Sequence, residues 1–385
     1  MALSKKSAGT GRMSVPRRKR KRKIALVLGG GGLKGFAHIG VLRAFDELGI
    51  RPALLAGTSI GSLISAAYVG GMPNEEMADR ARALRRRDLF RINRIGMVLE
   101  RMRSPSIYLE EPLRRVIEGI VPDKRLDELD APLLVNTVDL ERGSQVVWGL
   151  PGLRDVSVAE AVYASCALPG FFPPSSIGGR MCVDGGVIDN LPVGIASEGM
   201  DAVVAVDTGS ADLRAEATNN DAGFAAVYMR AATTMMHALQ LVPFARWGSP
   251  PMILIRPRIG HIGWFSFSET DQLLEAGYSA AMDAMENYES CLAEPGGVFP
   301  RRPVTLAVDR EKCVCCGFCV ALAPAVMALD KMRKAYPIRP TVQWSPADGD
   351  FVHHCPTLAI TATSPQAPGG APLDKSVNPP AEPTS

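Results

Sequence analysis

The sequence predicts an α/β layered sheet followed by a second, smaller unit. Short apolar runs typical of buried strands alternate along most of the chain with longer amphipathic runs typical of helices. With 385 residues and 46% hydrophobic composition, the chain can also bury one large core and one small core. A cluster of cysteines near the carboxyl end sets the smaller unit apart.

The expected elements of the large unit follow one another in regular alternation. We expect strands at 24–28, 53–56, 133–139, 145–148, 181–184, 202–207 and 252–256. We expect helices at 36–48, 62–70, 74–87, 109–119, 158–166, 222–241 and 268–288. Strands that alternate with helices in this way are typical of an α/β sheet.

A serine between two glycines joins the second expected strand to the helix that follows, in Gly57-Thr58-Ser59-Ile60-Gly61. This pattern is typical of a nucleophile elbow, a turn that holds the serine at a strained backbone angle and presents its hydroxyl at the carboxyl end of the sheet. The glycines are needed because a side chain there would clash with neighbouring backbone. The alternative interpretation is an ordinary strand-to-helix turn.

A glycine-rich turn, Gly29-Gly30-Gly31-Gly32, follows the first expected strand and begins an amphipathic helix. Backbone N–H groups at a helix start, with the positive end of the helix dipole, stabilise the oxyanion of a tetrahedral acyl intermediate. The rival interpretation is a phosphate-binding turn, because Gly30, Gly32 and Gly35 fit G-x-G-x-x-G. The next expected strand leads into the serine elbow, however, and not to the acidic residue of such a site. We therefore expect an oxyanion hole.

A serine nucleophile needs a base, and Asp184 is the best candidate because it ends an expected strand and precedes two glycines. A carboxylate paired directly with the serine can act as base if partial burial raises its pKa. The alternative role of Asp184 is to cap the following turn. None of the five histidines has a convincing catalytic context, and each is interpreted as structural: His38, His237, His261, His353 and His354.

The glycine-rich turn, the serine elbow and the D-G-G aspartate occur in the order found in patatin-like phospholipases, and residues 23–292 resemble that family. The resemblance implies a layered sheet with helices on both faces. It implies that Ser59 is the nucleophile, Asp184 the base and the Gly29–Gly32 amides the oxyanion hole. It also implies a phospholipid or lysophospholipid substrate.

The composition of the chain divides it into segments. Residues 1–23 hold ten Lys and Arg and no acid, and we expect them to form a disordered tail compatible with peripheral contact to an anionic membrane surface. The hydrolase domain is expected over 24–292, a Pro- and Gly-rich linker over 293–303, the small unit over 304–362 and a second disordered tail over 363–385.

The apolar stretch after the basic tail stops after five residues, below the roughly 7–15 of a signal peptide, so we expect a cytoplasmic protein. No apolar run approaches the roughly 18–20 residues of a membrane span, so any contact with the inner membrane face is expected to be peripheral. A second basic region between Arg80 and Arg94 is interleaved with apolar side chains. It is either an interfacial lid or a solvated helix face. Nucleic-acid binding is not expected, because neither basic stretch has a recognition motif.

The small unit contains a spacing typical of iron–sulfur ligands, Cys313-x-x-Cys316-x-x-Cys319 with a distant Cys355 followed by proline. Only one triplet exists, which predicts one [4Fe–4S] cluster. The surrounding residues resemble the small single-cluster bacterial ferredoxins, which implies an α+β unit and an electron-transfer partner. The alternative is tetrahedral zinc. Cys315 does not fit the ligand register and is left unassigned.

The predicted function is that of a serine-dependent lipid acyl hydrolase coupled to an iron–sulfur unit. The alternative, from a different class, is an electron-transfer or redox-sensing protein in which the α/β domain is a docking or weakly hydrolytic module. A serine-reactive fluorophosphonate separates the two hypotheses, because labelling of Ser59 requires an activated nucleophile.

Overall fold

The structure is a computed structural model and describes residues 22–92, 106–209, 246–345 and 354–363, with separate positions between 227 and 244 and between 348 and 352. Most of the basic tail at 1–23 and of the second tail at 363–385 lies outside the described residues. The same holds for much of the helix expected at 222–241.

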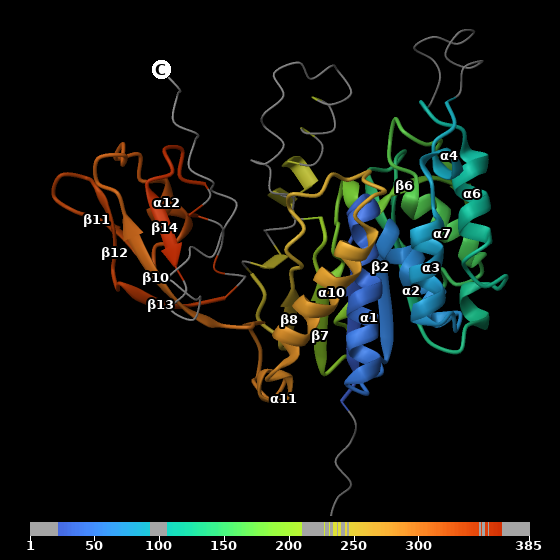
Figure 1. The fold of residues 1–385 in the computed structure, drawn as a ribbon, viewed down its shortest axis with the longest axis horizontal. Coiled ribbons are helices and arrows are strands. Elements are labelled where there is room, and N and C mark those ends of the chain that lie inside the picture. Colours follow the sequence, from blue (N-terminus) through green and yellow to red (C-terminus); the bar gives the residue numbers. More distant parts are fainter. Residues whose placement is uncertain are drawn as a thin grey trace, which may run out of the picture.

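A sheet of nine strands forms the centre of the large unit (Figure 1). The strands are β1 (Ile24–Leu28), β2 (Leu54–Thr58), β3 (Leu133–Asp139), β4 (Ser144–Trp148), β5 (Ser175–Ile177), β6 (Arg180–Asp184), β7 (Ala202–Val206), β8 (Met252–Ile255) and β9 (Val298–Phe299). Their order is β5-β6-β3-β2-β1-β7-β8-β9, and β4 pairs with β3. The strands from β3 to β9 in this order are parallel, whereas β4, β5 and β6 pair antiparallel.

Helices lie between these strands along the chain. They are η1 (Gly32–Phe36), α1 (Ala37–Glu47), α2 (Ile60–Val69), α3 (Asn74–Ala83), α4 (Arg86–Leu89), α6 (Glu110–Glu118), η3 (Leu126–Glu128), α7 (Val158–Cys166), η4 (Gly185–Val187), α8 (Val193–Ala196), α10 (Thr270–Met285) and α11 (Tyr288–Cys291). Every strand predicted from an apolar run is present within a few residues. The helix predicted over 74–87 is divided into α3 and α4 at Leu84, which has extended backbone.

Alternate residues of the strands face two separate cores, as expected for a sheet covered on both sides. In β1, Leu26 and Leu28 pack into a large core with residues of α1, α2, α3, α6, α7 and α10. Ala25 and Val27 face the other side and pack against α8 and Phe244. The α/β sheet with helices on both faces is therefore confirmed, with most of the helical mass on one face.

The small unit has strands β10 (Arg302–Val308), β11 (Met327–Leu329), β12 (Ala335–Pro337), β13 (Thr341–Trp344) and β14 (Ile360–Thr363), and one helix, α12 (Phe318–Leu322). They form a sheet of order β13-β10-β14 and the hairpin β11-β12 around a core of their own. Figure 1 shows this unit to one side of the large sheet. The stretch expected as linker, 293–303, contains β9, which pairs with β8 of the large sheet.

Within the part of the chain that the structure describes, we find no helix that is both long enough and apolar enough to span a bilayer.

Candidate active site

Ser59 lies in the sharp turn between β2 and α2, at the carboxyl end of the parallel strands. Its backbone has φ 54° and ψ −128°, a strained conformation for a residue with a side chain. The glycines on either side, Gly57 and Gly61, make the turn possible because they have no side chain. A Cβ on Gly57 would lie 2.5 Å from the Ser62 amide nitrogen, and a Cβ on Gly61 would lie 2.1 Å from the Leu28 carbonyl oxygen. Larger residues at these two positions would force the turn apart, so the geometry is that of a nucleophile elbow.

Hydrogen bonds on both sides of Ser59 hold the elbow in place. The Ser59 N–H donates to Ser165 Oγ at 2.8 Å, and Ser165 Oγ in turn donates to the Asn136 carbonyl at 2.7 Å. The Ser59 carbonyl accepts from the Ser62 N–H at 2.9 Å and from Ser62 Oγ at 2.6 Å. The backbone of Ser59 is thus fixed by β3, α7 and the first turn of α2, which preorganises the position of its hydroxyl.

Asp184 is the last residue of β6 and is 3% exposed. Burial raises the pKa of its carboxyl to about 6, and hydrogen bonds with the Ser59 side chain and the Gly186 N–H oppose this rise. The Gly186 N–H lies 2.8 Å from Asp184 Oδ1. The carboxylate therefore caps η4, the alternative role considered from the sequence, and also contacts Ser59. Above pH 6 it is ionised and can accept a proton from the serine hydroxyl.

The glycine-rich turn between β1 and η1 has two amides that are already engaged. The Gly29 N–H donates to the Val206 carbonyl at 3.0 Å, and the Gly30 N–H donates to the Asn190 carbonyl at 3.3 Å. The N–H groups of Gly31 and Gly32 lie at the start of η1, where the first N–H groups of a helix have no carbonyl partner within it. Among the described residues neither makes a backbone hydrogen bond. We therefore narrow the oxyanion donors expected over Gly29–Gly32 to Gly31 and Gly32.

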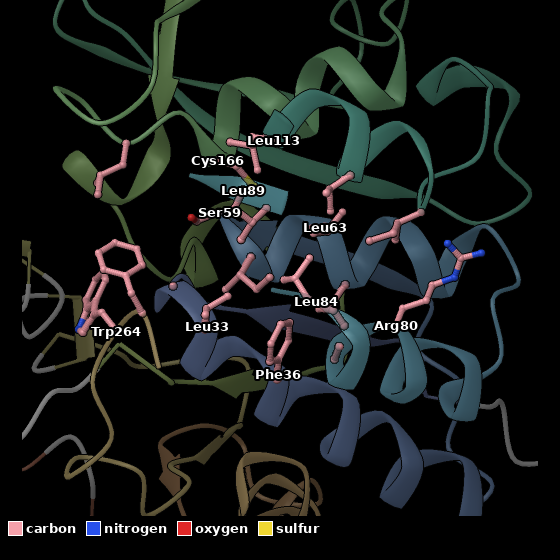
Figure 2. A pocket seen from close by; sticks show the side chains of 18 of the residues that line it. Leu33, Phe36, Ser59, Leu63, Arg80, Leu84, Leu89, Leu113, Cys166 and Trp264 are labelled. Atoms are coloured by element: carbon pink, nitrogen blue, oxygen red, sulfur yellow. The ribbon is translucent and has the colours of Figure 1, made fainter. Parts of the chain in front are cut away.

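Ser59 and Asp184 line a large apolar pocket. Figure 2 shows Ser59 among the side chains around it. The pocket has about 1020 Å³ of empty space, part of it open to solvent. The side chains around it come mainly from η1, α2, α3, α4 and α6 and include Leu33, Phe36, Leu63, Ile64, Met72, Met77, Leu84, Leu89, Leu113, Val116, Ile120, Phe172, Trp264 and Phe265. The pocket lies between the helices on the more crowded face of the sheet, so it can take a hydrocarbon chain away from water.

The basic region that begins at Arg80 forms one wall of this pocket instead of an all-solvated face. Arg80 lines the pocket while its guanidinium binds Glu76, and Leu84 and Leu89 point into the cavity. Phe90 stacks on Phe172, with 5.9 Å between ring centroids. Residues 93–105, which include Arg94 at the end of the basic region, lie outside the described residues.

Cys166 lines the pocket beside the candidate nucleophile and was not singled out from the sequence. Burial raises the pKa of its thiol, the Asp184 charge adds to the rise, and contacts with the Ser62 and Ser59 side chains oppose it. The thiol is therefore protonated at neutral pH and is no competing nucleophile. Cys166 ends α7 without any motif around it, so only the folded arrangement reveals its position.

The histidines that the structure describes in the large unit have structural partners. His38 is fully buried, and its Nε2 lies 2.8 Å from the Gly29 carbonyl oxygen. His261 Nε2 lies 2.8 Å from Gln272 Nε2. His237 and His353 lie outside the described residues, and His354 contacts Phe318 in the small unit. The group placed against the Ser59 side chain is the carboxylate of Asp184.

The four cysteines predicted as cluster ligands line one hollow in the small unit with about 350 Å³ of empty space, part of it open to solvent: Cys313, Cys316, Cys319 and Cys355. Burial raises the pKa of the Cys319 thiol, and the nearness of the other three thiols adds to the rise. Gly317 has φ 74°, a conformation that favours glycine, and lets the chain turn between the ligand positions.

The donor set fits a group held by thiolates. In addition to the four sulfurs, the Ala359 N–H donates to Cys355 Sγ at 3.3 Å, as N–H groups do toward ligand sulfurs. Among the described residues, no three His, Cys, Asp or Glu side chains gather closely enough for a single metal ion. Cys315 lies outside this ring of sulfurs, with φ 61° and its Sγ 3.8 Å from the Met332 carbonyl oxygen.

Comparison with known protein families finds proteins that are similar to the large unit. The sequence model described as "Patatin-like phospholipase" matches residues 26–197. The mouse patatin-like phospholipase domain-containing protein 6 is 36% identical over 194 residues, which cover 49% of this chain and 14% of the relative. The lysophospholipase nte1 of Aspergillus fumigatus is 29% identical over 295 residues, which cover 70% of this chain and 18% of the relative. The chain thus spans less than a fifth of the length of these relatives.

A shorter relative and two solved structures complete the comparison. An uncharacterized NTE family protein of Mycobacterium tuberculosis is 32% identical over 185 residues, 48% of each chain. VipD from Legionella pneumophila has a TM-score of 0.37 at 16% identity, and the match covers 69% of this chain and 67% of the VipD chain. The ExoU–SpcU complex from Pseudomonas aeruginosa has a TM-score of 0.34 at 17% identity, and the match covers 71% of this chain and 53% of the matched chain.

Proposed function

We propose that this chain, whose residues 26–197 are a patatin-like phospholipase domain, hydrolyses the acyl esters of phospholipids or lysophospholipids through Ser59 and Asp184. One observation carries the proposal. The only serine with a strained backbone among the described residues lies against a buried carboxylate whose pKa is raised to about 6. Both groups line a large apolar pocket.

The first half of the reaction forms an acyl-enzyme. Ser59 Oγ attacks the ester carbonyl carbon while Asp184 takes the hydroxyl proton. The carbonyl oxygen becomes an oxyanion, which the Gly31 and Gly32 amides and the amino end of η1 stabilise. The C–O bond to the glycerol oxygen then breaks, and Asp184 returns the proton to this leaving alkoxide. The lysolipid or glycerophosphodiester product departs, and the acyl group stays on Ser59.

In the second half, Asp184 removes a proton from water, which attacks the acyl carbon. The same amides hold the second oxyanion. The bond to Ser59 Oγ breaks, the proton returns from Asp184 to the serine, and the fatty acid leaves. Asp184 therefore acts as base and then as acid in each half, with no third residue in the proton path.

The pocket supports a lipid substrate over a small soluble ester. Its walls are almost entirely apolar, and Ser59 and Asp184 are among the few polar side chains that line it. A single acyl chain inserted between α2, α3 and α6 would bring its ester to Ser59 and leave the polar head group outside. The names of the relatives, which include a lysophospholipase, agree with this substrate class.

A fluorophosphonate probe tests the proposal, because stoichiometric labelling requires an activated serine. We expect the wild-type protein to be labelled and to hydrolyse lysophosphatidylcholine, and Ser59→Ala to lose both properties. The matched control is Ser65→Ala, which removes another buried serine hydroxyl of α2. Labelling that persists in Ser59→Ala would overturn the assignment of the nucleophile.

We further propose that the small unit holds one [4Fe–4S] cluster through Cys313, Cys316, Cys319 and Cys355. The four thiols around one hollow and the N–H donor to Cys355 Sγ support this assignment. When bound, such a cluster supplies one-electron redox chemistry. This unit is also what favours the second candidate function, electron transfer or redox sensing with a partner protein.

Anaerobic purification tests the cluster. We expect about four irons per chain and loss of the brown colour on Cys355→Ala, with Cys315→Ala as the matched control that keeps the colour. Stoichiometric zinc without iron would overturn the assignment in favour of the zinc alternative. Full esterase activity in Cys355→Ala would show that the two units work independently.

A further inference from the structure

The carbonyl oxygens of the glycine-rich turn are held by side chains that do not line the pocket. His38 Nε2 lies 2.8 Å from the Gly29 carbonyl oxygen. The Gly30 carbonyl oxygen accepts from Asn190 Nδ2 at 3.1 Å and from Thr208 Oγ1 at 3.5 Å. These contacts connect α1 and the loops after η4 and β7 to a turn from which the proposed mechanism draws its oxyanion donors.

The hydrogens of this network have a single consistent arrangement. A carbonyl oxygen only accepts, so the Nε2 atom of His38 must carry the hydrogen that reaches Gly29. Thr208 Oγ1 lies 3.3 Å from the same Nε2 and can accept from it while its own hydrogen goes to the Gly30 carbonyl. The ring N–H, the hydroxyl and the two carbonyls thereby form one connected chain of hydrogen bonds.

The surroundings of His38 keep its ring neutral. The side chain is fully buried, and burial lowers its pKa to about 4, although the Gly29 carbonyl and the Asp207 charge act in the opposite direction. Among the described residues, Nδ1 has no hydrogen-bond partner, so a hydrogen on this nitrogen would have no acceptor, which favours the tautomer that carries its hydrogen on Nε2. A neutral ring can hold the turn across the physiological pH range without placing a buried charge beside it.

Peptide geometry converts the position of a carbonyl into the direction of an amide. In a trans peptide the C=O of one residue and the N–H of the next point in opposite directions. The Gly30 carbonyl points toward Thr208 and Asn190, so the Gly31 N–H points away from them. Both glycines are closely packed: a Cβ on Gly31 would lie 2.7 Å from Thr208 Oγ1, and a Cβ on Gly30 would lie 2.5 Å from Asn190 Oδ1 and 3.2 Å from Ser59 Cβ.

We propose that His38, through the Gly29 carbonyl, and Thr208, through the Gly30 carbonyl that Asn190 also holds, are positioning residues that fix the glycine-rich turn so that the Gly31 N–H faces the oxyanion. The proposal rests on the proposed function, because it assigns these side chains to the oxyanion hole of that reaction. Neither residue touches the substrate. Both act through the turn, and a peptide that rotates when they are removed would withdraw the amide and present a carbonyl oxygen in its place.

Thr208→Val is the sharpest test, because valine keeps the shape of threonine and removes only the hydroxyl. We expect kcat on a soluble ester to fall about 10- to 100-fold, less than the 10²–10³ of a donor that is deleted outright, while KM stays within about twofold. Thr208→Ser keeps the hydroxyl and is the matched rescue variant. His38→Gln, which can still donate to Gly29, should retain more activity than His38→Leu.

A second readout distinguishes positioning from general damage. A trifluoromethyl ketone forms a tetrahedral adduct with the serine and needs the oxyanion hole, so its affinity should fall in parallel with kcat. The affinity of an unreactive fatty alcohol for the pocket should not change. Melting curves verify that each variant is folded.

The outcomes separate the two proposals. Wild-type protein that neither labels with fluorophosphonate nor turns over ester would overturn the proposed function itself. Active wild type together with a folded Thr208→Val of unchanged kcat and unchanged ketone affinity would overturn only the positioning role. Equal loss in Thr208→Val and Thr208→Ser would also contradict it, because the hydroxyl would then not be the group that matters.

Discussion

Replacing Asp184 by asparagine should abolish hydrolysis and at the same time stabilise the fold. The carboxylate is buried at the end of β6, where it costs free energy whenever it is ionised. Asparagine has nearly the same shape, keeps an oxygen that can accept from the Gly186 N–H, and carries no charge. The base of the proposed mechanism is thus predicted to be a local weakness of the fold.

The magnitude follows from the pKa. The carboxyl has a pKa of about 6 in the folded protein against a reference value of 3.8. Because the pKa is higher in the folded protein, the protonated carboxyl stabilises the fold relative to the ionised carboxylate. This stabilisation is fully present below pH 3.8 and is lost as the pH rises through 6. Each pKa unit corresponds to about 1.4 kcal/mol, so the ionised side chain costs about 3 kcal/mol at pH 7.5. We expect Asp184→Asn to recover much of that amount.

Urea unfolding and thermal melting of both proteins at pH 7.5 and pH 4.5 measure the effect. The melting temperature should rise by about 2–4 °C per kcal/mol at pH 7.5, and at pH 4.5, which is still above the reference pKa of 3.8, the difference should fall to about a third. Asp139→Asn is the matched control of opposite sign, because a hydrogen bond from Arg142 lowers the pKa of Asp139, so its loss should destabilise at neutral pH. An Asp184→Asn protein that is less stable at pH 7.5 would refute the reasoning.

Three further predictions concern the site and the tail. The pH dependence of kcat/KM should rise through about pH 6 as Asp184 loses its proton and then level off; a profile unchanged between pH 4.5 and 8 would exclude this base. Gly30→Ala should lose most activity, because its Cβ would lie 2.5 Å from Asn190 Oδ1, whereas Gly194→Ala has open space and should be neutral in a melting and turnover assay. Deleting residues 1–23 should weaken salt-sensitive binding to anionic vesicles by up to about 1 kcal/mol per basic residue near the surface, and should spare turnover of a soluble ester; vesicle binding that survives the deletion would assign that contact elsewhere.

The strands were predictable wherever burial left a long apolar run. β1 and β3 are found at the residues that the sequence indicates, since each is buried along its whole length. β5 and β9 were not expected, because runs of three and two residues carry too little periodicity to be read. Strands with a long apolar run could therefore be predicted from the sequence, whereas the shortest strands at the sheet edges could not.

The candidate site was predictable in its residues and only partly in its geometry. Ser59 and Asp184 carry local motifs, and the structure brings them together although they lie far apart in the sequence. The glycines of the first turn indicate an oxyanion hole, but they do not indicate which amides are free. That depends on Val206 and Asn190, which reach Gly29 and Gly30 only through the fold. The pocket likewise combines helices that no local pattern connects.

The pairing of β9 with β8 bears on how the large unit can be prepared by itself. Met252 and Ile253 of β8 are covered along the sheet edge by Val298 and Phe299, which immediately precede the small unit. A chain cut after residue 292 would leave those backbone groups of β8 without their partner and expose an apolar edge, which is a template for intermolecular strand pairing. Such a fragment should precipitate or form aggregates even if its catalytic residues are intact, whereas a chain that ends after Arg301 keeps the edge protected.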